Sequence, residues 1–287
     1  MKRIFALTLF CLCMFTVCAL ADIHVDEPTP EDWTERDLLR LTVFPTYTND
    51  AMLMECGGES MLIDGGYGQW YDKMRQALAD RGYGEHITYV LNTHPHDDHI
   101  ETQTELLRRG GLTCDAFLSP FAEDYGNKLH KIMVSVLHDK GIAYRQLLNG
   151  ETFAFGGASI DCASWLDAVA INDRSLQMHV HFGNTTLLLT GDLTGKGQHH
   201  YLETLSAEDL QSTVLKAPHH SITHMVVEYL ETVNPEFVIL INEKSKVSKS
   251  ENQLTKRDIP HLYNTNTTIV LETDGNDWYI TSSKGWN

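Results

Sequence analysis

Three histidines and two aspartates fall within six consecutive positions, 94–99, of this 287-residue chain. Neutral imidazole and carboxylate are the ligands that a borderline divalent ion such as zinc prefers. The apolar run 87–91 just before them predicts a strand that would carry these side chains on a rigid support into a turn. The first two histidines could then face one ion while the second aspartate and the third histidine face another. The sequence therefore predicts metal ligands at His94, His96, Asp98 and His99.

Further polar positions follow apolar runs in the same way. Asp64 precedes two glycines, which let the backbone turn sharply. Asp192 ends a second apolar run, and the pair His219 and His220 ends a third. Each of these features alone is typical of an ordinary turn. Together they predict several strand ends that converge on one metal site.

The elements that must position these residues alternate along the chain. Short apolar runs typical of strands are followed by helical stripes in both halves. The apolar stripe from Phe121 to Leu137 predicts a helix, whereas the polar stretch 244–257 predicts a surface loop. We therefore expect an α/β fold of two sheets packed face to face with helices outside, as one domain over residues 38–287.

The first 21 residues are expected to be a secretory signal peptide rather than part of the fold. Lys2 and Arg3 precede the apolar run 4–17, which is short for a membrane span, and small residues follow at 19–21. We therefore expect export to a periplasm or to the medium, with no membrane span in the mature chain. The acidic segment 22–37 contains two prolines and predicts a mobile lead-in.

Charge and cysteine content limit the partners and the fold class. The net charge is −17, and an acidic surface repels nucleic acid and anionic membranes. We therefore rank nucleic acid below a small molecule or a cell-wall polymer as the substrate. Beyond the signal peptide the cysteines are Cys56, Cys114 and Cys162, which allow at most one disulfide and exclude a disulfide scaffold.

The order Asp64, the segment 94–99, Gly191-Asp192 and a late histidine resembles the metallo-β-lactamase-fold hydrolases, over about residues 38–281. This resemblance implies an αββα four-layer sandwich and two divalent ions, with zinc first and manganese or iron as alternatives. The C-terminal half is more narrowly similar to the metallo-hydrolase domain of ComEC-type competence proteins. The segments that carry the narrower similarity are 172–176, 188–192, 215–220 and 272–275.

The resemblance also implies a role for each matching position. His94 and His96 would bind the first ion, and Asp98 and His99 would bind the second. Asp192 would bridge the two ions. Asp98 would in addition orient the attacking hydroxide and accept a proton, which makes it the expected catalytic residue.

Four other residues receive roles, three of them from the same resemblance and Lys216 from its position in the sequence. Either His219 or His220 would complete the second site. Asp64 would hydrogen-bond a ligand and fix its orientation. Lys216, at a strand end near the site, could contact an anionic group of the substrate.

The sequence departs from the family pattern at three places. Where most members have another histidine before Gly-Asp, this chain has Asn172 and Asp173, and Asp173 is our candidate to fill the first site. The segment 100–102 replaces two glycines after the histidine motif, and Ser221 replaces a glycine after the late histidines. The last two changes add side chains beside the expected metal ions, so they affect the expected substrate class more than the expected metal binding.

The chemistry that this site implies is hydrolysis. Two divalent ions about 3.5–4 Å apart would lower the pKa of a shared water, and the resulting hydroxide would attack carbon or phosphorus. The competence-type resemblance and the expected export favour a phosphoester, with a phosphodiester first. An acyl hydrolase, such as a β-lactamase or lactonase, is the alternative, although most such enzymes use the missing histidine. A non-catalytic exported binding protein is the third hypothesis, against which the retained ligand set argues.

Overall fold

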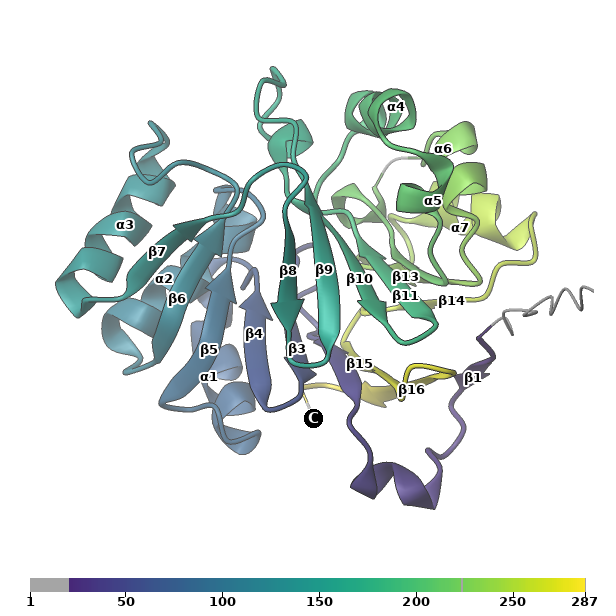
Figure 1. The fold of residues 1–287 in the computed structure, drawn as a ribbon, viewed down its shortest axis with the longest axis horizontal. Helices are drawn as coiled ribbons and strands as arrows, with labels where there is room; N and C mark the ends of the chain where they lie inside the picture. The colour runs from purple at the N-terminus through teal and green to yellow at the C-terminus, as the bar shows by residue number, and fades with distance from the viewer. Residues whose placement is uncertain (1–20, 223, 287) are drawn as a thin grey trace, which may run out of the picture.

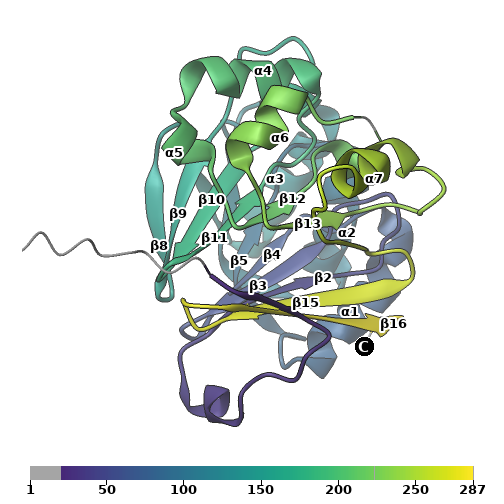
Figure 2. The same cartoon turned by 90° about the vertical axis from the view of Figure 1, so that its right-hand side faces the viewer.

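The computed structural model describes residues 21–222 and 224–286. Two β-sheets pack face to face, and helices cover the outer face of each sheet (Figures 1 and 2). The four-layer αββα arrangement expected from the sequence is therefore confirmed.

The first sheet has nine strands in the order β1-β16-β15-β2-β3-β4-β5-β6-β7. It is antiparallel from β16 to β4 and parallel from β4 to β7. Its strands are β1 (Ile23–Val25), β2 (Leu39–Val43), β3 (Met52–Cys56), β4 (Glu59–Ile63), β5 (His86–Leu91), β6 (Thr113–Ser119), β7 (Ala143–Gln146), β15 (Thr267–Thr273) and β16 (Trp278–Lys284).

The second sheet has seven strands in the order β14-β13-β12-β11-β10-β9-β8. It is antiparallel from β8 to β11 and parallel from β11 to β14. Its strands are β8 (Thr152–Phe155), β9 (Ala158–Ala163), β10 (Gln177–Phe182), β11 (Thr185–Leu189), β12 (Val214–Lys216), β13 (Phe237–Leu240) and β14 (His261–Tyr263).

The helices divide between the two outer faces. The first sheet is covered by α1 (Tyr71–Asp80), α2 (Asp97–Arg109) and α3 (Lys128–Lys140). The second is covered by α4 (Gly195–Thr204), α5 (Ala207–Leu210), α6 (Val227–Val233) and α7 (Ser248–Thr255). The short 3₁₀ helices are η1 (Glu31–Glu35), η2 (Gly68–Trp70), η3 (Asn172–Arg174) and η4 (His219–Ser221).

Three apolar cores hold the four layers together. The largest lies between the sheets, where Leu41 and Leu187 are completely buried. A second joins the first sheet to its helices through residues such as Phe117 and Met133. A third joins the second sheet to its helices. Because burial of apolar surface is the main favourable term in folding, these cores fix the sheets on which the polar strand ends are mounted.

Several expectations from the sequence need correction. Residues 22–37 are not only a lead-in, because β1 pairs in parallel with β16 at the sheet edge. The predicted surface loop 244–257 contains α7, and its polar composition reflects a helix with one exposed side. The third helix begins at Lys128 rather than near Phe121, because Oδ1 of Asn127 caps it by accepting the amides of Leu129 and His130.

Cys56, Cys114 and Cys162 are buried free thiols. The predicted signal peptide lies outside the described residues apart from Ala21, so it stays a prediction. Over the described ranges, none of the helices combines the length and the apolar character that crossing a bilayer requires.

Candidate metal centre

Strand ends from both sheets meet at one edge of the sandwich. Asp64 follows β4, the segment 92–96 follows β5, Asp192 follows β11, and His220 follows β12. A backbone hydrogen bond of 3.0 Å from the amide of Leu176 to the carbonyl of Thr93 joins the two halves here. Parallel strands end at the same edge of a sheet, which explains why residues so far apart in the sequence converge.

Asp192 lies at the centre of the polar cluster. Its Oδ2 is 3.1 Å from Nε2 of His220, 3.4 Å from Nε2 of His99 and 3.9 Å from Nε2 of His94. Asp98, in the first turn of α2, places its Oδ2 3.2 Å from Nε2 of His220. One ligand atom from each of Asp98, His99, Asp192 and His220 lies within 4.8 Å of the other three.

The atoms of this cluster fit divalent metal ions. Nε2 of His99, Nε2 of His220 and Oδ1 of Asp192 are buried and form no hydrogen bond with the described residues. The carboxylate of Asp192 is near both imidazoles, but not in hydrogen-bonding geometry. Since buried polar atoms in proteins are nearly always paired, these unpaired nitrogen and oxygen atoms, grouped in one buried cluster, suit divalent ions as ligands.

His94 and His96 form the other side of the centre. Nε2 of His94 is 3.0 Å from Nδ1 of His96, a separation that two ligands of one ion can have. On its far side, Nδ1 of His94 lies 3.2 Å from the hydroxyl of Ser175 and 3.2 Å from that of Thr93. The ring of His94 is thus oriented by groups from both sheets.

Asp64 is completely buried behind His99. Its Oδ2 lies 2.7 Å from Nδ1 of His99, so the opposite nitrogen of the ring faces Asp192. The amide of Thr93 and the side chain of Asn92 donate to Oδ1 at 2.9 Å and 3.0 Å. A carboxylate held this firmly fixes both the tautomer and the orientation of the imidazole.

Of the two late histidines, His220 faces the cluster and His219 does not belong to it. Nε2 of His219 instead lies 3.1 Å from the side-chain nitrogen Nδ2 of Asn172. His219, His220 and Ser221 have φ angles of 50°, 47° and 59°. Three consecutive residues with side chains in the left-handed region form a strained turn, and it is this turn that points the two rings apart.

Two predicted site residues have other functions in the structure. Asp173 accepts hydrogen bonds from the amides of Thr194 and Gly197, at 2.8 Å and 3.2 Å, at the start of α4. Its carboxylate stabilises that helix and is not available to the first ion. Lys216 is fully buried and cannot meet a substrate at the surface.

Sequence reasoning missed Asp50, which precedes β3 and is completely buried. It contacts both Lys216 and Nδ1 of His220. Asp50 precedes a strand instead of following one and is 170 positions from His220, so no local pattern marked it.

Gly191 shows how tightly the loop before Asp192 is packed. Its φ is +51°, and an added Cβ would lie 2.6 Å from Cβ of Ser175. Ser175 in turn accepts the amide hydrogen bond of Asp192 at 3.1 Å. A glycine is therefore needed for Ser175 to reach Asp192 and His94 together.

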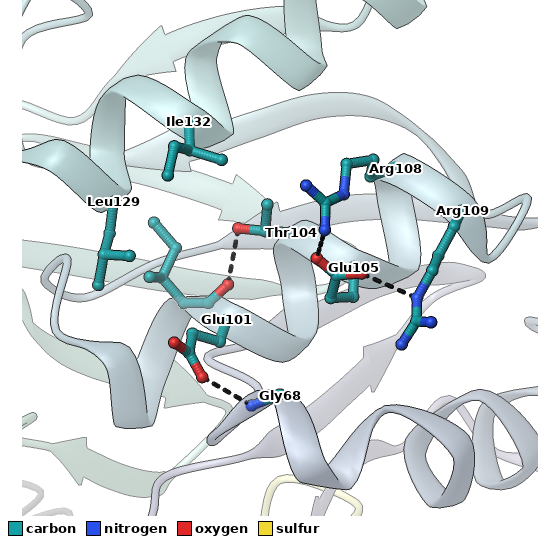
Figure 3. Close-up of a pocket in the computed structure, with 9 residues that line it drawn as sticks. Gly68, Glu101, Thr104, Glu105, Arg108, Arg109, Leu129 and Ile132 are labelled. Atoms are coloured by element: carbon teal, nitrogen blue, oxygen red, sulfur yellow. Dashed lines mark hydrogen bonds and ion pairs between the residues drawn. The ribbon is translucent and has the colours of Figure 1, made fainter.

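A cavity of about 420 Å³ lies on the outer side of α2, between α2 and α3 (Figure 3). Figure 3 shows Glu105 between Arg108 and Arg109, and both arginines pair with it. Glu101 lines the cavity and accepts a hydrogen bond of 3.0 Å from the amide of Gly68. None of the residues in the polar cluster lines this cavity, so it is separate from the candidate metal centre.

The comparisons with known proteins agree with this geometry. The family model described as the metallo-β-lactamase superfamily matches residues 46–239, more than half of the chain. The chain belongs to the metallo-β-lactamase superfamily. Members of this superfamily bind divalent metals, and the His/Asp cluster provides suitable ligands.

Among solved structures, two similar folds are informative. The metallo-β-lactamase fold protein YhfI from Bacillus subtilis gives a TM-score of 0.52 at 14% identity, over 79% of this chain and 96% of that one. CmlA, a diiron β-hydroxylase from Streptomyces venezuelae, gives 0.51 at 14% identity, over 82% of this chain and 53% of that one. At such identities the likeness shows the fold alone. No curated protein matches the sequence.

The buried charged groups of this centre strongly shift one another's pKa values. Burial alone would lower the pKa of His99, but the charges of Asp192 and Asp64 outweigh it and raise that pKa to about 10. Burial disfavours a charge on His220 as well, yet Asp192 and Asp50 raise the pKa of His220 well above its usual value. The imidazole of His99 is therefore protonated at neutral pH in the metal-free protein, and the neighbouring carboxylates favour the protonated form of His220 as well.

We expect metal binding to release protons, because a bound ion needs the neutral imidazole of His99. Below the pKa of about 10, the apparent affinity should rise about tenfold per pH unit for this one proton. In the metal-free protein the same raised pKa stabilises the fold below pH 6.5, and this stabilisation is lost as the pH rises towards 10.

Titration calorimetry with zinc in two buffers of different ionisation enthalpy measures this release. The buried His130, which contacts the carbonyl of Ala122 and lies outside the cluster, supplies the control variant His130→Gln. The control should release the same number of protons as the wild type. A binding enthalpy that does not depend on the buffer would contradict the expectation.

The strained turn gives a second expectation. Replacing Ser221, whose φ is +59°, by glycine should raise the free energy of unfolding by about 1 kcal/mol, because glycine adopts this conformation without steric cost. Chemical denaturation of the metal-free protein measures the change. The exposed Ser245 does not have a positive φ, so Ser245→Gly should give no stabilisation. Equal effects of the two variants would show that the turn stores no strain.

Proposed function

We propose that this protein is an exported, metal-dependent hydrolase that acts on a phosphodiester. The observation that carries the hydrolase proposal is the convergence of ligand atoms from Asp98, His99, Asp192 and His220 within 4.8 Å of one another, with Nε2 of both histidines unpaired. Bound divalent ions would supply a water of lowered pKa and neutralise the charge that develops on the reacting group. Zinc is our first choice of metal, and the similarity of residues 1–21 to a signal peptide supports export.

Asp98 is the proposed catalytic residue. Its side chain is 18% exposed, whereas that of Asp192 is 3% exposed, so Asp98 is the carboxylate of the cluster that solvent can reach. Burial raises the pKa of Asp98, but its contacts with protonated His220 and His99 outweigh this and lower it. An ionised, accessible carboxylate can orient a water molecule and accept its proton.

Arg174 supports an anionic substrate. It belongs to η3, and the next residue along the chain, Ser175, contacts His94 of the site. Its guanidinium donates to the carbonyl of Ala168 and to the hydroxyl of Tyr125, at 2.6 Å and 3.1 Å.

Both partners of Arg174 are neutral. Within the described part of the chain, no carboxylate pairs with it. An arginine without a counter-charge, in a protein of net charge −17, is suited to bind a phosphoryl oxygen. Together with the competence-type similarity and with Asn172 in place of a histidine, it favours a phosphodiester over an acyl substrate.

The substrate class is tested with chromogenic phosphodiesters, carboxylesters, lactones and β-lactams, with added zinc or manganese. We expect hydrolysis of the phosphodiester, its loss on chelation, and its recovery when metal is returned. Asp192→Asn should lower the rate by at least about 100-fold, because it removes the negative charge of a proposed ligand and not only a supporting group. A protein that binds two metals and cleaves only acyl compounds would favour the lactonase or β-lactamase alternative. A protein that binds no metal would favour a non-catalytic role.

Substitution of Arg174 tests the anionic substrate separately. Arg174→Gln should lower kcat/KM for the phosphodiester about 10- to 100-fold, the effect of losing a hydrogen bond to a charged group. The kcat/KM of Arg174→Lys should lie between those of the wild type and Arg174→Gln, since lysine keeps the charge but lacks the planar guanidinium with its paired donors. The metal content of both variants should equal that of the wild type.

The matched control is Arg109→Gln, which changes an arginine that pairs with Glu105 outside the site. This control should keep wild-type kcat/KM. An unchanged kcat/KM in Arg174→Gln would exclude Arg174 from substrate binding.

A further inference from the structure

Asp50 and Lys216 form a fully buried ion pair directly behind His220. Both side chains are 0% exposed. Oδ1 of Asp50 lies 3.1 Å from Nδ1 of His220, while its Oδ2 contacts the ammonium of Lys216. The same ammonium donates a 2.9 Å hydrogen bond to the carbonyl of Gly191, the residue before Asp192.

Each oxygen of Asp50 therefore has a separate task. A carboxylate oxygen at Nδ1 of His220 holds a hydrogen on that nitrogen, so the lone pair of a neutral ring is on Nε2. Nε2 is the atom that faces Asp98 and Asp192, at 3.2 Å and 3.1 Å. Lys216 holds the second oxygen and so prevents the carboxylate from rotating away.

Stability alone does not explain this pair. Replacing a buried ion pair by apolar residues of similar volume is often neutral or stabilising, because removing two charges from water is costly. The pair also supports the strained turn at His220. Strained backbone persists only where surrounding contacts over-determine it, and here the carbonyl of His220 accepts a 3.0 Å hydrogen bond from Asn242 as well.

We propose that Asp50 and Lys216 are positioning residues that set the tautomer and direction of His220 towards the second metal ion. Lys216 acts through Asp50 and does not touch the substrate. The pair also links His220 to the carbonyl of Gly191, so it fixes the loop after β11, which carries Asp192, relative to the turn after β12, which carries His220. This inference rests on the proposed function, because it concerns how tightly the proposed ions are bound.

Three variants separate positioning from a purely structural role: Asp50→Asn, Lys216→Met, and both together. An asparagine can present either its oxygen or its NH₂ group to His220, so it no longer selects one tautomer. Zinc affinity is measured by competition with a chromogenic chelator, and the stability of the metal-free protein by thermal unfolding.

We expect Asp50→Asn to weaken binding of one of two zinc ions about 10- to 100-fold. Lys216→Met should lower the unfolding temperature, because it leaves Asp50 as an uncompensated buried charge. The double variant should regain much of that unfolding temperature but not the zinc affinity, since no carboxylate then faces Nδ1.

The control is Asp173→Asn, which alters a buried carboxylate that holds α4 and contacts no member of the cluster. It should lower the unfolding temperature and leave zinc affinity unchanged. Wild-type zinc affinity in Asp50→Asn, or recovery of both quantities in the double variant, would overturn the inference alone. A wild-type protein that binds no zinc would instead overturn the proposed function, and the inference with it.

Discussion

The structure depends on the rule that a buried charge needs an opposite charge beside it. Asp192 is 3% exposed and lies within 3.4 Å of two imidazole nitrogens. Burial would raise its pKa, but the charges of His220 and His99 outweigh this and lower it far below the usual value. Removing an ion from water costs several kcal/mol, so these groups are stable inside the protein only as a set. The set includes Asp64 and Asp50, each beside one imidazole.

The fold makes this set possible by mounting its members on the most rigid elements available. Most members of the set follow the ends of β4, β5, β11 and β12, and the apolar core between the sheets fixes the strands themselves. The remaining adjustment is made in backbone of unusual conformation. Asp64 has a φ of +52°, and the turn at His220 is left-handed over three residues. Such unfavourable φ angles are found at functional sites, where the direction of a side chain matters more than the conformational energy of its own backbone.

The sequence pattern predicted those site residues that lie next to the strand that positions them. A strand followed by a polar turn marked Asp64, the segment 94–99 and Asp192, since both the periodicity and the ligands lie in one stretch of sequence. The membership in the superfamily and the four layers followed from the order of these stretches.

Residue roles that depend on contacts between distant segments could not be predicted from the sequence pattern. His219 and His220 differ only in which way a strained turn points them. Asp173 looked like a ligand, but the free amides at the start of α4 bind its carboxylate. Asp50 and Lys216 are 166 positions apart, and each alone resembles a surface residue. The loop at 244–257 was misread because a helix with one buried side needs few apolar residues when it is eight residues long.

Charge balance explains why a lysine is buried so close to a site for cations. The carboxylates of Asp98, Asp192, Asp64 and Asp50 would carry four negative charges between them. Two divalent ions would cancel those charges, and the Lys216 ammonium would offset the negative charge of the attacking hydroxide. A centre without Lys216 would then be negative and would repel an anionic substrate more strongly. Lys216 can thus favour an anionic substrate through the total charge of the centre, without any contact with that substrate.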